Sequence, residues 1–182
     1  MPLHEKPKSG LRSFLGFIIF AMCVLVVSFL LREYVIGGYQ IPSGSMEETI
    51  QVGDMVFADK LFYKAQGIQP DEIVTFYDDE SGNILIKRCV ATAGQTVDLK
   101  NGKLYIDGVE QDKAYTQGKP TYPLKNSKIS FPYTVPANSI FCLGDNRTNS
   151  QDSRYFGAVS LDKVEGHAVF RYWPLNAIGP LN

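Results

Sequence analysis

The chain has 182 residues, a length typical of one domain with a short additional segment, and 45% of its residues are hydrophobic, enough for a sizeable core. Its 18 Lys and Arg residues nearly balance 19 Asp and Glu residues, so the net charge is −1, and no basic run occurs after the first dozen residues. This excludes the basic surface that nucleic-acid binding requires, and we expect no DNA or RNA partner.

An uncharged apolar run, FLGFIIFAMCVLVVSFLL at 14–31, is long enough to cross a bilayer as a helix. Three basic residues precede it, whereas Arg32 and Glu33 cancel each other after it. The positive-inside rule therefore predicts a cytoplasmic tail over 1–13 and an extracytoplasmic domain over 32–182, in a single-pass protein of the cell membrane. A cleaved secretory signal peptide is the alternative, but its apolar part normally has only ~7–15 residues, and no Ala-x-Ala site follows here.

Three cysteines give an odd count, and Cys23 lies inside the apolar run, where a thiol behaves as a small hydrophobe. Cys89 and Cys142 remain for the outer domain, and an oxidising compartment permits a disulfide between them. A single pair in a domain of this size is no disulfide framework, so two buried free thiols are the simpler expectation.

After the apolar run, the sequence becomes a series of short segments rich in β-branched and aromatic residues, separated by Gly, Pro, Asn and Asp. This pattern predicts strands joined by tight turns, without a long amphipathic helix. We therefore expect a mainly β domain, built as an antiparallel β-barrel or folded double sheet. The predicted strand segments are 55–63, 72–77, 83–92, 96–108, 128–135, 139–145 and 167–175.

The strongest local signal is the pair Asn101-Gly102, which stands between two alternating segments within 96–108. An Asn-Gly pair in this setting predicts a β-hairpin with a type I′ turn. The following stretch, 111–130, is polar and weakly periodic, so we expect an excursion from the core or a small subdomain.

Few kinds of catalytic or metal site are compatible with this chain. His167 is the only histidine of the expected outer domain, and neither H-E-x-x-H nor paired Cys-x-x-Cys spacing occurs, so we expect no metal and no cofactor. His167 falls in a strand-like segment, where a structural role is commoner than a place in a Ser-His-Asp triad.

A serine nucleophile can instead be activated by a lysine whose burial disfavours the ammonium form. The segment IPSGSMEETI at 41–50 holds Ser43 and Ser45, although Ser and Gly are also ordinary turn residues. Lys87 lies among apolar neighbours in NILIKRCVAT, where its pKa can fall from the usual ~10.4 toward neutrality. A third segment, GDNRTNSQDSRYFG at 144–157, alternates Arg and Asp with small polar residues, as suits a rigid loop that orients a site.

Together these segments resemble the type I signal peptidases, membrane-bound Ser/Lys endopeptidases that remove signal peptides from exported proteins. The likeness follows the chain from the apolar run through PSGSM at 42–46, GDMVFADKLFY at 53–63, KR at 87–88 and GDNRTNSQDSR at 144–154. It implies a signal-peptidase β fold behind an N-terminal anchor and a hydrolase without metal or cofactor. The implied partners are signal peptides of secreted preproteins and the lipid bilayer, with the protein-export machinery nearby.

The resemblance implies a role for each matched residue. Ser45 is the expected nucleophile and Lys87 the general base, while Ser43 adds its hydroxyl to the oxyanion site beside the backbone N–H of Ser45. Gly44 lets the substrate backbone approach closely. Ser150 is expected to hydrogen-bond Lys87 and fix its amine.

The remaining implied residues brace the site or contact the substrate. Two ion pairs are expected to stiffen the third segment, Arg88 with Asp145 and Arg154 with Asp152. Small apolar pockets for the residue before the cut and the one two positions earlier are expected to be lined by Ile41, Met46, Ile50, Leu85 and Ile86. An extended substrate is expected to add as a strand beside NILIKR.

The chain departs from the family pattern in three places. Glu48 stands where the family usually has proline, ATAGQ at 91–95 where it often has GLPGD, and Thr148 where it usually has aspartate. These changes affect loop geometry and pocket shape but remove no catalytic group.

Two alternatives fit parts of the sequence. A non-catalytic membrane-anchored β domain, acting as an envelope binding or assembly module, explains the anchor and the strands but not Ser43, Ser45, Lys87 and Ser150. A soluble self-cleaving Ser/Lys protease of the repressor type needs no apolar run.

Overall fold

The computed structural model describes residues 9–181, and the chain divides into two compact units, Met1–Val35 and Ile36–Asn182. Residues 1–8 of the tail predicted over 1–13 lie outside the described residues. The first unit contains α1 (Ser9–Tyr34).

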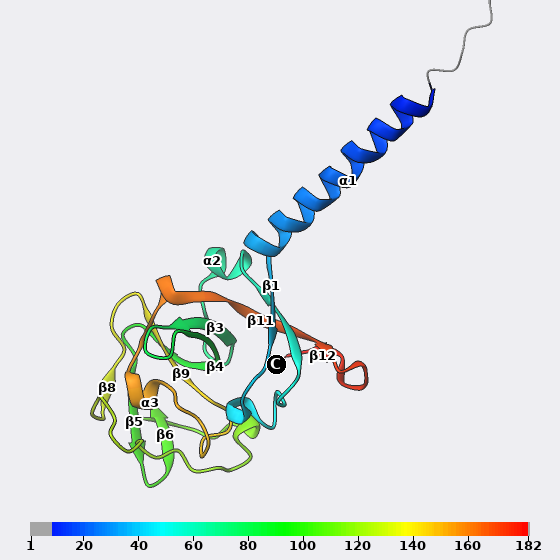
Figure 1. Ribbon diagram of the computed structural model, residues 1–182. Helices are drawn as coiled ribbons and strands as arrows, with labels where there is room; N and C mark the ends of the chain where they lie inside the picture. Colours follow the sequence, from blue (N-terminus) through cyan, green and yellow to red (C-terminus); the bar gives the residue numbers. More distant parts are fainter. Residues whose placement is uncertain (1–8, 182) are drawn as a thin grey trace, which may run out of the picture. The chain divides into compact units, whose positions relative to one another are not determined.

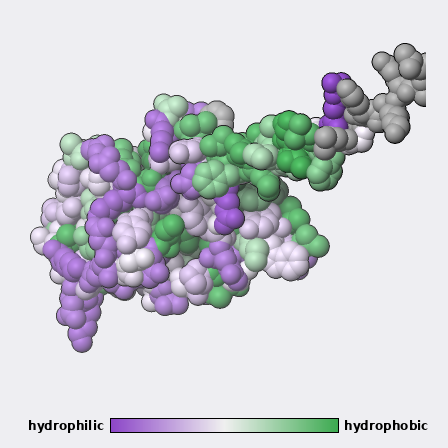
Figure 2. All heavy atoms as spheres, turned by 45° about the horizontal axis from the view of Figure 1, so that its top comes forward, coloured by the Kyte–Doolittle hydropathy of each residue, from purple (hydrophilic) through white to green (hydrophobic). Residues whose placement is uncertain are grey.

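Helix α1 includes the whole apolar run predicted to cross a membrane. Among residues 9–181 it is the one helix long and apolar enough to do so, over Arg12–Tyr34. Figure 2 shows its surface as an almost unbroken hydrophobic stretch. A helix that is apolar on all sides, rather than along one stripe, suits a lipid environment better than the surface of a globular domain.

The second unit is built on an eight-stranded antiparallel sheet (Figure 1). Its order is β1-β2-β11-β3-β4-β9-β10, and β12 pairs with β11. Strand β11, the last long strand of the chain, thus lies between two early strands. The strands are β1 (Ile36–Gln40), β2 (Met55–Asp59), β3 (Ile73–Asp78), β4 (Asn83–Thr92), β9 (Ser139–Leu143), β10 (Val159–Ser160), β11 (Val164–Trp173) and β12 (Gly179–Pro180).

A second sheet has four strands in the order β7-β6-β5-β8. They are β5 (Thr96–Lys100), β6 (Lys103–Ile106), β7 (Val109–Gln111) and β8 (Tyr133–Thr134). Between β5 and β6, Asn101 and Gly102 both have positive φ, 52° and 76°, which confirms the predicted type I′ hairpin.

The mainly β double-sheet class is confirmed, but the barrel is wrong. The path of the first sheet ends at β1 on one side and β10 on the other, and that of the second ends at β7 and β8. The terminal strands β8 and β10 have two residues each, too short to carry pairing onward and close a barrel.

Two predicted strands are shorter than expected. After β2 the side chain of Asp59 accepts a hydrogen bond from the backbone N–H of Leu61 (2.9 Å), which takes the chain out of the ladder. In 128–135 the strand is confined to β8, because Pro132 has no N–H to donate. Short helices fill the connections: α2 (Phe62–Gln66), α3 (Ser153–Phe156), η1 (Gly44–Met46), η2 (Ala114–Thr116), η3 (Leu161–Lys163) and η4 (Leu175–Ala177).

Strand β4 connects the three clusters of the hydrophobic core. Its alternation sends Ile86 into the first cluster and Cys89 into the second. A register shift between Cys89 and Ala91 then interrupts the alternation, and Val90 and Ala91 both belong to the third cluster. This central position makes β4 a rigid support for the residue between them, Lys87.

Candidate active site

Ser45 lies in η1, the short helix that follows β1 after three connecting residues. It is 6% exposed, and the next residue, Met46, is fully buried in the first core cluster. The loop after β9 holds the backbone on both sides: Asn146 donates its side-chain N–H to the Gly44 carbonyl (3.0 Å) and its backbone N–H to the Ser45 carbonyl (3.1 Å). The nucleophile segment is therefore fixed by its backbone, which leaves the Ser45 hydroxyl available.

Lys87 approaches this hydroxyl from β4. It is 3% exposed, and its Nζ lies 2.7 Å from Ser45 Oγ and 2.9 Å from the Ile86 carbonyl oxygen. Burial lowers the pKa of the Lys87 amine from 10.5 to about 8, against the opposing attraction of the Asp152 carboxylate. A useful fraction of this amine is neutral near pH 7–8, as a base must be.

A cavity of about 450 Å³ opens beside the two groups. Ser43, Gly44 and Ser45 line it together with Leu85 and Lys87. Ser43 occupies the N-cap position of η1 but makes no capping hydrogen bond with its side chain. Its exposed hydroxyl can therefore turn toward a ligand in the cavity.

Ser150 does not form the hydrogen bond to Lys87 that the resemblance implies. Its Oγ is buried without a hydrogen-bond partner among the described residues, while Lys87 Nζ bonds to Ser45 and the Ile86 carbonyl. A Cβ at Gly144 would lie 2.3 Å from Ser150 Oγ and 2.5 Å from the Ser45 carbonyl oxygen. Only glycine fits there, because Gly144 lies between Ser150 and the nucleophile segment.

The two implied ion pairs are present and buried. Arg88 donates to Asp145 through Nε (2.9 Å) and Nη2 (2.7 Å), and Thr49 Oγ1 donates to the same carboxylate (2.6 Å). A second pair joins Arg154 and Asp152, whose Oδ2 also accepts the backbone N–H of Gly144 (3.0 Å). Bidentate pairs are geometrically specific, and each carboxylate also holds a residue from another part of the site.

The five predicted pocket residues do not form one wall. Ile41, Met46, Ile50 and Ile86 pack together in the first core cluster. Leu85 is on the other face of β4, because strand residues alternate, and it lines the cavity with Lys87.

Sequence reasoning missed several contacts around Arg88 and the loop. The Tyr115 ring lies 4.1 Å from the Arg88 guanidinium, and its hydroxyl donates to Asp71 (2.8 Å). Burial, together with the Asp71 carboxylate, raises the pKa of Tyr115, which keeps its proton for this bond. Thr121 accepts from Arg147 Nη1 (2.8 Å). Thus the predicted excursion, 111–130, packs on the loop that carries the site, a contact no local pattern signals.

Three other candidate groups, Cys89, Cys142 and His167, are not among the described residues that line the cavity beside Ser45. Cys89 and Cys142 face each other across β4 and β9 as buried free thiols, as the simpler expectation held. His167 lies in β11 opposite Asp59 of β2 and Val74 of β3.

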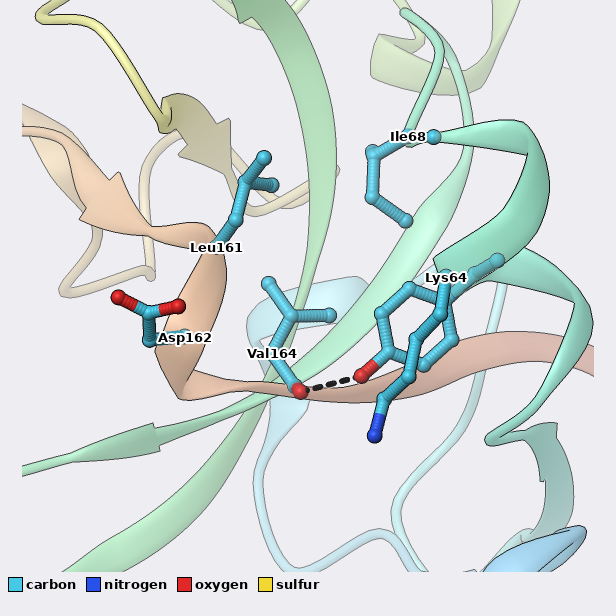
Figure 3. Close-up of a pocket in the computed structure, with 7 residues that line it drawn as sticks. Lys64, Ile68, Leu161, Asp162 and Val164 are labelled. Atoms are coloured by element: carbon cyan, nitrogen blue, oxygen red, sulfur yellow. Dashed lines mark hydrogen bonds between the residues drawn. The ribbon is translucent and has the colours of Figure 1, made fainter.

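A separate cavity of about 360 Å³ lies between α2 and η3 (Figure 3). Tyr63 donates its hydroxyl to the Val164 carbonyl (2.6 Å) there, and Lys64 and Asp162 stand on opposite sides. The described residues of its lining include no serine or cysteine, so it does not repeat the serine–lysine arrangement of the first cavity.

Comparison with known proteins gives a consistent result. The family model described as "Signal peptidase, peptidase S26" matches residues 12–173. A probable signal peptidase I-1 of Synechocystis sp. is 35% identical over 168 residues, covering 88% of this chain and 83% of that protein. Signal peptidase I of Leptolyngbya laminosa is 33% identical, covering 86% and 78%. A crystal structure of a signal peptidase I from Enterococcus faecalis V583 is 32% identical, with a TM-score of 0.47, and covers 55% of this chain and 95% of that chain.

Proposed function

The chain belongs to the signal peptidase family, peptidase S26, and we propose that it cleaves signal peptides with Ser45 as nucleophile and Lys87 as general base. Its enzyme class is that of signal peptidase I, a serine endopeptidase. The observation that carries the proposal is the 2.7 Å contact between a buried lysine amine and a serine hydroxyl at the edge of a cavity.

The reaction follows from these positions. Neutral Lys87 takes the proton of Ser45 as Oγ attacks the carbonyl carbon before the cut. The oxyanion accepts hydrogen bonds from the Ser45 backbone N–H and the Ser43 hydroxyl. Lys87 then gives its proton to the leaving amine, and the acyl-enzyme remains. A water, deprotonated by the same amine, hydrolyses the ester and restores Ser45.

The surrounding residues have positioning roles in this proposal. Ser150, whose buried hydroxyl has no hydrogen-bond partner among the described residues, is proposed to accept a hydrogen bond from the Lys87 amine once that amine gives up its bond to Ser45. The buried pairs of Arg88 with Asp145 and Arg154 with Asp152 brace the loop.

Strand β4 also offers a docking edge for an extended substrate. Strand β3 pairs with 83–88, whereas β9 pairs on the other side with 88–92. Residues 83–87 thus keep one edge unpaired among the described strands, where a peptide can add. Ile41, Met46, Ile50 and Ile86 lie behind this edge and suit small apolar side chains before the cut, with Leu85 on the cavity side.

The apolar helix supports a membrane anchor. We place the span at 14–31, the tail 1–13 in the cytoplasm and the catalytic domain 32–182 outside, following the positive-inside rule. In that arrangement the partners are the lipid bilayer and the signal peptides of preproteins emerging from the export machinery.

The dyad is tested by assaying detergent-solubilised protein on a preprotein with an Ala-x-Ala site. Ser45→Ala and Lys87→Ala are expected to lower kcat by at least ~10³-fold, as loss of a nucleophile or its base does. Ser139→Ala and Lys100→Ala, remote from the cavity, serve as matched controls and retain wild-type rates. Undiminished cleavage by either dyad variant contradicts the mechanism, and no cleavage by the wild type favours a non-catalytic envelope module.

A further inference from the structure

A second hollow lies beside the cavity at Ser45 and Lys87. Asp78, Glu80 and Phe156 line both the 450 Å³ cavity and this neighbouring hollow of about 190 Å³, so the two share these residues as a common wall. Together they form a groove that reaches from Ser45 past the Phe156 side chain and the turn between β3 and β4, farther than attack on one peptide bond requires.

The chemistry indicates which part of the substrate enters the groove. The base must pass its proton to the leaving amine, so the segment after the cut lies on the Lys87 side of Ser45. Leu85 and Lys87 face the groove, whereas Ile86 is buried on the opposite face of β4 with the residues proposed to hold the segment before the cut. The chain before the cut pairs with the free edge of 83–87, whereas the chain after the cut leaves this edge at Lys87 and crosses the cavity face of β4, where Leu85 lies, toward Phe156.

The charges along this path are unequal. Near the cut the groove carries the carboxylates of Asp78 and Glu80, and Lys87 is uncharged when it acts as base. The cations Lys128 and Lys163 line only the second hollow, where Lys128 donates to Glu80 (2.6 Å) and Lys163 pairs with Asp79. A substrate side chain that enters the groove next to the cut therefore lies near negatively charged carboxylates. Lys128 partly neutralises the charge of Glu80.

We infer that the two neighbouring hollows bind the first residues of the mature protein after the cut, and that Glu80, opposed by Lys128, is a specificity-determining residue that favours basic over acidic side chains there. This rests on the proposed function, because it takes Ser45 and Lys87 as the point of cleavage. The turn between β3 and β4 then contacts the first residues of the mature protein and discriminates between their charges.

Three preproteins that differ at one position test this. The position is the third residue after the cut, occupied by Lys, Gln or Glu, and the series is repeated at the second, fourth and fifth residues. Full-length enzyme in neutral detergent is expected to show a roughly three- to tenfold higher kcat/KM for Lys than for Glu at one or more of these positions. The ratio shrinks at high salt, since the groove is open to solvent.

Charge-neutral variants identify the residue responsible. Glu80→Gln is expected to bring the Lys-to-Glu ratio toward one, whereas Lys128→Gln, which frees Glu80, is expected to increase it. The matched controls are Glu110→Gln and Lys103→Gln, an exposed pair with the same 2.6 Å contact between β6 and β7. Both controls leave the ratio and the basal rate unchanged.

The outcomes separate this inference from the function it rests on. A ratio of one at every position, or a ratio that Glu80→Gln leaves unchanged, overturns the inference while Ser45-dependent cleavage persists. A charge effect that appears only before the cut assigns the groove to the other segment and also overturns it. Failure of the wild type to cleave any of the preproteins contradicts the proposed function itself.

Discussion

Lys87 holds its proton less tightly than an ordinary lysine, because burial lowers its pKa to about 8. If it acts as the base, kcat/KM falls about tenfold per pH unit below pH 8 and levels off above it. The profile is measured on a peptide substrate without titratable groups. A rate that still rises at about pH 10 would show that the buried amine is not the base.

The same residue destabilises the fold. The unfolded chain binds more protons than the native one between pH 8 and 10.5, so stability rises with pH through this window and the full penalty, about 3 kcal/mol, applies below it. We expect Lys87→Met to raise the free energy of unfolding at pH 7 by ~1–3 kcal/mol, an advantage that diminishes by pH 10. Urea denaturation of both proteins at the two pH values measures this, and a pH-independent difference contradicts it.

The residues of the site could be predicted from contiguous sequence motifs. The contacts that they make were harder to predict, because these depend on the direction in which each side chain points. Ser45 and Lys87 are separated by more than forty residues, and their contact follows from a family likeness rather than from any local pattern. The expected bond from Ser150 to Lys87 is not formed, because Lys87 Nζ instead bonds to Ser45 Oγ and the Ile86 carbonyl oxygen. Leu85 and Ile86 face opposite ways, as strand alternation requires, although both were assigned to the same pockets.

At the scale of elements, strands with strong local signals were predicted well. Strand β4 runs over the expected 83–92, because its apolar and β-branched residues are bounded by a Gly-Asn turn, and the Asn101-Gly102 hairpin formed as expected. Helix α2 was missed, because a side-chain bond from Asp59 ends the preceding strand. Strand β8 lies within the predicted 128–135 but is shorter, because Pro132 has no N–H to donate. The open sheets depend on tertiary pairing, which local patterns do not specify.

The excursion 111–130 contributes stability through Tyr115. Tyr115→Phe keeps the ring on Arg88 but loses the bond to Asp71, so we expect a loss of ~1 kcal/mol in the free energy of unfolding. Tyr115→Ala loses both and is expected to cost ~3 kcal/mol or more, with lower activity. Urea denaturation separates the two variants, and equal small losses would mean that the excursion does not brace the site.

At the scale of the whole molecule, we expect the two units to have different roles: Ile36–Asn182 carries the catalytic activity, and the helix of Met1–Val35 attaches the chain to the membrane. Ile36–Asn182 contains all three core clusters, so a protein without 1–35 is expected to fold and to cleave soluble peptides. The full chain is expected to stay with membranes under alkaline carbonate extraction, because α1 exposes apolar side chains on every side. Release of the full chain by carbonate would contradict the anchor.

The position of β11 between β2 and β3 limits how early in its synthesis the catalytic domain can fold. Strand β2 follows the nucleophile segment, and β3 pairs with β4, the strand that carries Lys87. Strand β11, which joins β2 to β3, is synthesised almost last. At ~5–20 residues per second, translation needs on the order of ten seconds to pass from Lys87 to the end of β11. Through that interval both reactive groups exist but their sheet is incomplete. We therefore expect the nascent chain to have no peptidase activity until β11 has paired with β2 and β3.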